Sequence, residues 1–122
     1  MDNRSIVLRK VGGFYQAFDD DALIISYLFN YKITNYRSGF PVNTLNKVTN
    51  ALEERKINYL VKGEEETFKV FKKDNNYSKY LDKAKTKDKI DKRVKNILEK
   101  LNSMETTKLE KILKTIEEII YE

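Results

Sequence analysis

The sequence of 122 residues contains no cysteine and no histidine. Without cysteine it has no disulfide framework and no thiolate metal site. Without histidine it lacks the commonest general base and the commonest metal ligand. Composition therefore excludes catalytic sites of the Ser-His-Asp and Cys-His kinds. We expect a protein that is not an enzyme and that holds no metal or cofactor.

Glycine and long apolar runs are scarce as well. The four glycines stand at positions 12, 13, 39 and 63, and none fits a Walker A nucleotide-binding loop. No apolar run approaches the ~18 residues of a membrane span. The first residues lead almost directly into a strand-like run, so we expect no secretory signal, no membrane association and a cytoplasmic protein.

Charged residues are abundant, and the net charge of +5 is unevenly distributed. Residues 1–71 carry 10 basic and 9 acidic side chains, whereas residues 72–101 carry 11 and 5. Two interpretations of the basic segment remain open. It attracts nucleic acid phosphates, or it is a lysine-rich helix face in solvent.

Residues 1–74 are predicted to form an α/β (α+β) core. The runs on either side of Gly12-Gly13 predict a β-hairpin. Asp19, Asp20 and Asp21 are expected to cap a helix that ends near Asn30. Further strands are predicted at residues 32–36, 57–62 and 67–71, with a turn at 37–39 and a second helix from an Asn43 N-cap to about residue 56. Because the hairpin is antiparallel and helix-linked strands can be parallel, we expect a small mixed sheet with flanking helices.

Residues 75–122 are predicted to form a helical extension. An asparagine at 75 or 76 caps a short helix to about residue 85, and apolar residues from 90 to 101 mark a longer one. After a break at 103–106, Thr107 and Glu110 fit a capping box for a last helix. Two helices joined by a short break predict a helical hairpin. It either packs on the core or pairs with a second copy of the chain.

Phe14 and Gln16 are the candidate functional pair, because alternation on a strand places them on one face. An aromatic ring just past a tight turn can stack on a base, and the Gln16 amide can hydrogen-bond a base edge. Lys10 on the neighbouring strand can contact phosphate. The alternative interpretation of Phe14 is a core residue, as for most strand phenylalanines. For Asp19 to Asp21, magnesium binding is the alternative to a role at the helix start.

Two blocks of the sequence resemble the N-terminal mismatch-recognition domain (domain I) of the MutS DNA mismatch repair family. The first is Val-Leu-Arg-Lys-Val-Gly-Gly-Phe-Tyr-Gln-Ala-Phe-Asp-Asp-Asp-Ala at 7–22, which is similar to an apolar strand followed by Gly-Asp-Phe-Tyr-Glu and then by acids and alanine. The second, Gly-Phe-Pro-Val-Asn-Thr-Leu at 39–45, is similar to a Gly-Ile-Pro-x-His-x-Leu segment. The resemblance covers residues 6–71.

The resemblance implies a non-catalytic DNA-binding domain. Phe14 matches the phenylalanine that wedges beside a mispaired base, and Gln16 stands where the family has a glutamate that hydrogen-bonds it. Gln16 is uncharged, and Gly13 replaces the usual aspartate. We assign Phe14, Gln16, Lys10 and Arg37 to the expected DNA-binding site.

Three functional hypotheses follow. The first is a stand-alone mismatch-recognition-like domain, in which the basic segment compensates for the few phosphate contacts of an isolated domain. The second is a protein-interaction or regulatory module that keeps the fold, loses the base-reading role and binds a protein or a second copy through its terminal helices. The third is a metal-dependent nuclease built on Asp19 to Asp21.

Overall fold

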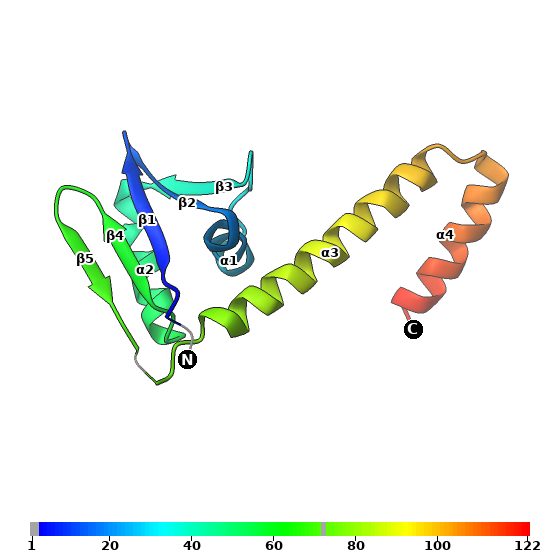
Figure 1. Cartoon of the computed structure of the whole chain (residues 1–122). Helices are drawn as coiled ribbons and strands as arrows, with labels where there is room; N and C mark the ends of the chain where they lie inside the picture. Colours follow the sequence, from blue (N-terminus) through cyan, green and yellow to red (C-terminus); the bar gives the residue numbers. More distant parts are fainter. Residues whose placement is uncertain (1–2, 72) are drawn as a thin grey trace. The chain divides into compact units, whose positions relative to one another are not determined.

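The computed structural model describes residues 3–71 and 73–122 and divides into two units, one ending at Asp88 and the other running from Lys89 to Glu122 (Figure 1). The strands are β1 (Ile6–Val11), β2 (Phe14–Phe18), β3 (Arg37–Pro41), β4 (Tyr59–Lys62) and β5 (Glu66–Lys69). The helices are α1 (Asp19–Phe29), the 3-10 turn η1 (Val42–Thr44), α2 (Leu45–Glu54), α3 (Tyr77–Asn102) and α4 (Thr106–Ile120).

The five strands form one mixed sheet in the order β3-β2-β1-β4-β5. β1 is parallel to β4, and the other neighbouring pairs are antiparallel. The parallel pair arises because the helical connections through α1 and α2 bring the chain back to the edge of β1 in the same direction. The predicted α/β fold with a mixed sheet, flanking helices and C-terminal helices is therefore confirmed.

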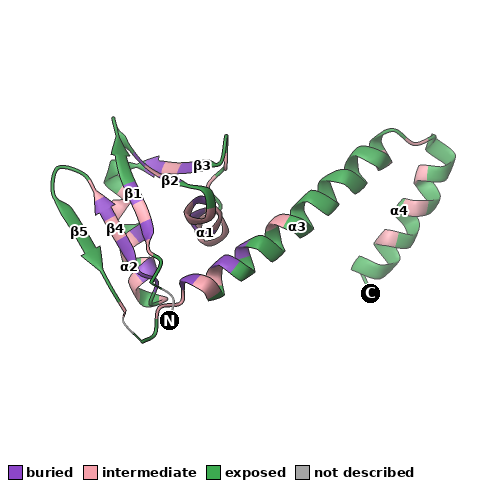
Figure 2. Ribbon diagram, in the orientation of Figure 1, coloured by how far each residue is buried: buried purple, intermediate pink, exposed green. Residues whose placement is uncertain are grey.

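Side chains alternate between the two faces of the sheet, and the helices of the first unit cover one of them. Buried side chains of β1, β2, β3 and β4 pack there against α1, α2 and the first turns of α3 (Figure 2). The core consists of Ile6, Leu8, Tyr15, Ala17, Ile24, Ile25, Phe40, Val48, Leu52, Ile57, Tyr59, Val61, Tyr77 and Leu81.

The opposite side of the sheet is called the open face here. It carries the side chains at positions 7, 9 and 11 of β1, 14, 16 and 18 of β2, 37, 39 and 41 of β3, 60 and 62 of β4, and 66 and 68 of β5. None of these residues is buried. The sheet thus has one face in the core and one toward solvent, as antiparallel-rich sheets often do.

The strand predicted at residues 32–36 is wrong, and so is the turn predicted at 37–39. The turn comes earlier, because Asn35 and Tyr36 adopt left-handed φ values of 52° and 62°. Thr34 and Arg37 exchange two backbone hydrogen bonds across it. Residues 37–41 then form β3, which pairs with all five residues of β2.

Three of the predicted helix caps are also wrong. No side chain caps α1, whose N-cap residue is Phe18. α2 begins at Leu45 after the 3-10 turn, so Asn43 is not its N-cap. α4 begins at Thr106 with Glu105 at the N-cap and no side-chain cap, so the capping box at Thr107 does not form.

α3 is one continuous helix, not the two predicted between residues 75 and 101. The segment from 85 to 90 contains neither glycine nor proline, so nothing in it interrupts the backbone hydrogen bonds. Asn75 does cap the helix start, because its Oδ1 accepts a hydrogen bond from the N–H of Tyr77 at 3.3 Å. The predicted break before the last helix is confirmed at residues 103–105.

Asparagine side chains fasten the start of α3 to the sheet. Asn75 Oδ1 accepts a hydrogen bond from the N–H of Asn58 (3.0 Å), and Asn75 Nδ2 donates to the carbonyl of Arg4 (2.9 Å). Asn76 Nδ2 donates to the carbonyl of Arg55 (2.8 Å). These bonds satisfy backbone groups at strand and helix ends that would otherwise lack partners.

The second unit has a different surface from the first. From Lys89 on, no described residue is buried. Its exposed large apolar side chains are Ile90, Val94, Ile97, Leu98, Leu113, Ile119, Ile120 and Tyr121. Packing of the helical extension on the core or in a dimer stays a prediction.

Candidate nucleic-acid interface

Phe14 stands at the start of β2, directly after the two-residue hairpin turn. The turn is Gly12-Gly13, across which Val11 pairs with Phe14. Gly12 has a φ of 61°, a left-handed conformation that glycine adopts without steric cost. The N–H of Val42 donates to the carbonyl of Gly13 at 3.0 Å, which fixes the turn to η1. The hairpin turn is therefore fixed both by the pairing of β1 with β2 and by this hydrogen bond to η1.

The Phe14 side chain is 51% exposed on the open face. The interpretation of Phe14 as a core residue is therefore wrong. The neighbouring position, Tyr15, provides the buried ring instead, stacked on Phe40 with a centroid distance of 6.0 Å. The ring of Phe14 is left free for contact with another molecule.

Gln16 lies two residues along β2, on the same face and half-buried. Its cross-strand partners are Arg9 on β1 and Gly39 on β3. A Cβ atom at Gly39 would come within 3.0 Å of the Tyr15 carbonyl oxygen and 3.4 Å of Gln16 Cγ. Because Gly39 has no side chain, it leaves room for the Gln16 side chain beside it.

The other two predicted site residues, Arg37 and Lys10, lie on opposite sides of the sheet. Arg37 pairs with Phe18 and lies on the open face with Phe14 and Gln16. Lys10 pairs with Tyr15 and therefore projects on the opposite side of the sheet. There its Nζ lies 3.5 Å from Glu64 Oε1. The structure brings together Phe14, Gln16 and Arg37 on one surface, and Lys10 lies on the other side of the sheet.

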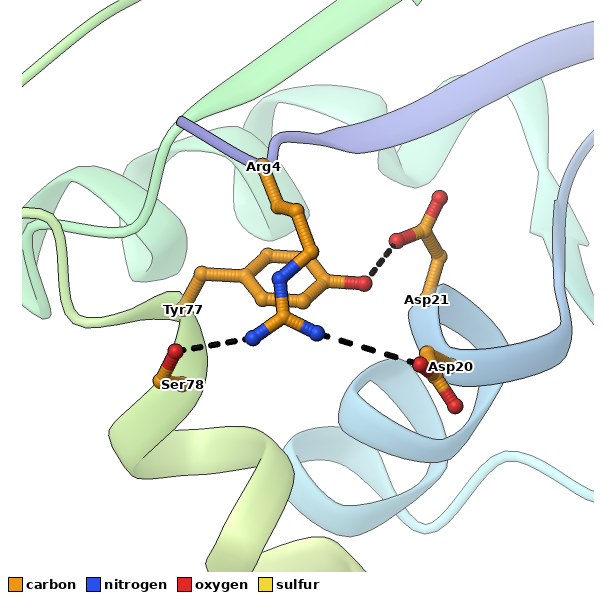
Figure 3. Close-up of polar contacts among 5 residues, drawn as sticks. All are labelled: Arg4, Asp20, Asp21, Tyr77 and Ser78. Atoms are coloured by element: carbon orange, nitrogen blue, oxygen red, sulfur yellow. Dashed lines mark hydrogen bonds and ion pairs between the residues drawn. The ribbon is translucent and has the colours of Figure 1, made fainter. Parts of the chain in front are cut away.

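Asp19, Asp20 and Asp21 follow Phe18 at the end of β2. Asp21 makes two hydrogen bonds within the fold. One carboxylate oxygen accepts a hydrogen bond from the hydroxyl of Tyr77 (Figure 3), and the other accepts one from the N–H of Val7 at 3.1 Å. Burial raises the pKa of the Asp21 carboxyl, and these two hydrogen bonds oppose that shift. Asp21 therefore joins β1, α1 and α3.

Arg4 lies over the same cluster. Its guanidinium carbon is 4.7 Å from the centre of the Tyr77 ring, and its two terminal nitrogens face Ser78 Oγ (2.8 Å) and Asp20 Oδ2 (4.0 Å) (Figure 3). Burial and the hydrogen bond to Asp21 raise the pKa of the Tyr77 hydroxyl far above its usual range. Within the described part of the chain, no group of acidic side chains comes together as a metal site requires.

Three residues with a place on the open face were missed by sequence reasoning. Arg9 pairs with both Gln16 and Lys62, and Phe68 pairs with Leu60 on the outer side of β4. The two-residue turn contained the signal for Arg9, because pairing Val11 with Phe14 also pairs Arg9 with Gln16. Lys62 and Phe68 carry no such local signal, since their neighbours come from distant parts of the chain.

Comparison with known families adds an independent finding to this geometry. The architecture of the first unit is that of a small α/β domain with a mixed five-stranded sheet. Residues 1–62 match MutS domain I, so the chain belongs to the MutS domain I family. The match covers β1 to β4 and ends before β5. No curated protein matches the chain.

None of the helices between residues 3 and 122 that the structure describes has the length and apolar character needed to cross a membrane.

Proposed function

We propose that the chain is a non-catalytic DNA-binding domain that reads distorted or mismatched duplexes. The observation that carries this proposal is the exposed Phe14 ring beside Gln16 on the sheet face opposite the core. Phe14 stacks or wedges beside a base, and Gln16 hydrogen-bonds the base edge. Arg37 and the basic segment 72–101 contact the phosphate backbone.

The side chain of Gln16 is neutral, and this decides which base edges it can hydrogen-bond. The Gln16 amide donates and accepts hydrogen bonds, and it carries no charge that repels phosphate. The absence of a side chain at Gly39 leaves room for the Gln16 side chain on this face. Gln16 therefore fits base edges of more than one donor and acceptor pattern, and discrimination rests mainly on how easily the duplex unstacks.

The test is binding of the full chain to matched and mismatched duplexes of equal length in low salt. We expect tighter binding to the mismatch, and we expect Phe14→Ala to weaken that binding about tenfold, because stacking on one base contributes ~1–3 kcal/mol. Tyr121→Ala is the control, since Tyr121 is an exposed aromatic ring outside the sheet. Equal affinity of the Phe14→Ala and Tyr121→Ala variants would contradict the proposal.

A second candidate function is a protein-interaction module. It is favoured by the large apolar side chains that remain exposed on α3 and α4. Such side chains are usual where helices meet a partner. A second copy of the chain is one such partner, because it presents the same apolar side chains for packing against them.

Light scattering of the purified chain distinguishes this function from the first. A dimer that persists in high salt and is lost in an Ile97→Asp, Leu98→Asp variant supports the interaction module. Lys95→Asp changes charge on the same helix without removing an apolar group, and it is the matched control. A chain that stays monomeric at all concentrations contradicts self-association.

A further inference from the structure

The open face carries more exposed aromatic surface than the proposed duplex contact uses. Phe14 and Phe18 lie on β2, and Phe68 lies on β5, where it is 70% exposed. Positions 14 and 18 are four residues apart along the strand, a distance of about 13 Å at ~3.3 Å per residue. Phe68 lies three strands away from β2 in the sheet order. The three rings are therefore spread over the face, with other side chains between them.

Strand register shows which side chains lie between the rings. Arg9 is paired with Gln16 on one side and with Lys62 on the other, so these three form a polar row across β2, β1 and β4. The row ends on β5 at Glu66, the partner of Lys62. Phe14, paired with Val11, lies on one side of this row. Phe68, paired with Leu60, lies on the other side. Aromatic rings therefore flank a row that holds an amide, two cations and, at its β5 end, one acid.

The charge of the open face favours a polyanion. Its sheet positions carry three cations, Arg9, Arg37 and Lys62, and one acid, Glu66. The acids at its margin are Asp19, Asp20 and Asp21, which line a shallow hollow with Phe18, Val7 and Arg9. Asp20 faces Arg4, and Asp21 is bonded to Tyr77 and Val7. A phosphate chain would therefore avoid the Asp19 margin and follow the polar row.

We propose that the open face binds an unpaired nucleic acid strand. Bases stack on Phe14 and Phe68, and the phosphates between them contact Arg9 and Lys62. Widely spaced rings on a flat sheet suit unstacked bases, whose faces a duplex keeps covered. A protein partner would instead be matched by a continuous apolar patch, which the charged row interrupts. This inference goes beyond the proposed duplex contact, because Arg9, Lys62 and Phe68 have no role there.

The experiment measures binding of the full chain to a fluorescein-labelled 15-nucleotide oligothymidylate by anisotropy in low salt. We expect Phe68→Ala and Lys62→Ala each to raise the Kd for this strand about fivefold or more. The matched controls are Tyr121→Ala, an exposed ring of the second unit, and Lys47→Ala, an exposed cation of α2. Both controls should keep the Kd of the unmodified chain. Circular dichroism should show an unchanged fold, since Phe68 has little buried surface.

Binding to mismatched and matched duplexes is measured in parallel, so that the two proposals fail separately. If Phe14→Ala weakens duplex binding but Phe68→Ala and Lys62→Ala leave oligothymidylate binding at the control value, the duplex proposal stands and this inference is overturned. If Phe68→Ala weakens oligothymidylate binding while matched and mismatched duplexes bind equally, this inference stands and the duplex proposal is overturned. If these variants change only the oligomeric state, the open face is a protein contact and the inference is overturned.

Discussion

Gly12 is the residue on which the position of Phe14 depends most directly. Its φ of 61° lies in the left-handed region, and nothing lies within 4 Å of an added Cβ at either Gly12 or Gly13. The two turn glycines therefore differ in backbone conformation and not in available space. This difference makes them a matched pair for mutagenesis.

We predict that Gly12→Ala lowers the free energy of unfolding by about 1–2 kcal/mol, because a side chain is strained at positive φ. Gly13→Ala is the control and should change it by much less, since Gly13 does not have a positive φ. Urea denaturation of both variants measures the difference. Equal destabilisation by the two substitutions would show that the turn does not require glycine at position 12.

At the scale of the elements, α3 is joined to the sheet through its first turns. Tyr77, Leu81 and Ala84 are its buried residues. The Tyr77 hydroxyl donates to the buried Asp21 carboxylate, and Arg4 covers the ring. This cluster holds the first turns of α3 against the α/β core.

The raised pKa of Tyr77 predicts sensitivity of the fold to alkali. In the unfolded chain the tyrosine ionises near pH 10, whereas in the folded chain burial and Asp21 hold the proton to higher pH. The contribution of Tyr77 to stability is therefore complete below pH 10 and is lost as pH rises above it. We predict that the free energy of unfolding decreases above pH 10, and that Tyr77→Phe makes this decrease less steep.

At neutral pH, Tyr77→Phe should also destabilise the chain by about 1–3 kcal/mol, because Asp21 then loses a hydrogen bond to its buried carboxylate. Tyr59 adds a smaller alkaline contribution, since burial and the hydrogen bond to Glu53 raise its pKa to about 12. Tyr36→Phe, at an exposed position, is the control. Denaturation curves between pH 7 and 11 measure the free energy of unfolding of each variant. If this free energy falls equally steeply with pH in Tyr77→Phe and in the unmodified chain, the predicted role of Tyr77 is refuted.

At the scale of the whole molecule, most of the positive charge lies outside the sheet. Residues 72–101 carry 11 of the 24 basic side chains. Under the DNA-binding proposal this segment supplies phosphate contacts that are independent of base sequence, and each such contact releases counterions from the DNA. The affinity of the full chain for duplex DNA should therefore fall steeply as salt increases.

We predict that an Arg93→Ala, Lys95→Ala, Lys100→Ala variant reduces the slope of log K against log salt by about 2–3, since each phosphate contact contributes ~0.9 to that slope. Mismatch preference should not change, because these residues do not read bases. Filter binding between low and physiological salt measures both quantities. A triple variant with an unaltered slope would indicate that this part of the helix is a solvated face and not a DNA contact.

The sequence by itself determined the features that depend on neighbouring residues. The Gly12-Gly13 turn and alternation on the strand placed Phe14 and Gln16 on one face, and the family resemblance agrees with the match over residues 1–62. Local patterns also predicted α1, α2 and α4, although not their caps. In each of these cases the interaction spans only a few residues, so composition and spacing are enough to specify it.

The tertiary structure alone decided the features that depend on distant parts of the chain. The left-handed conformations of Asn35 and Tyr36 moved β3 to residues 37–41, where full pairing with β2 outweighs the local preference for strand at 32–36. Asp21, expected to cap a helix, instead bonds to Val7 and Tyr77. Arg9, Lys62 and Phe68 share a face only because β4 pairs beside β1 and β5 beside β4. Strand pairing over such separations is set by the whole core, and no local pattern in the sequence encodes it.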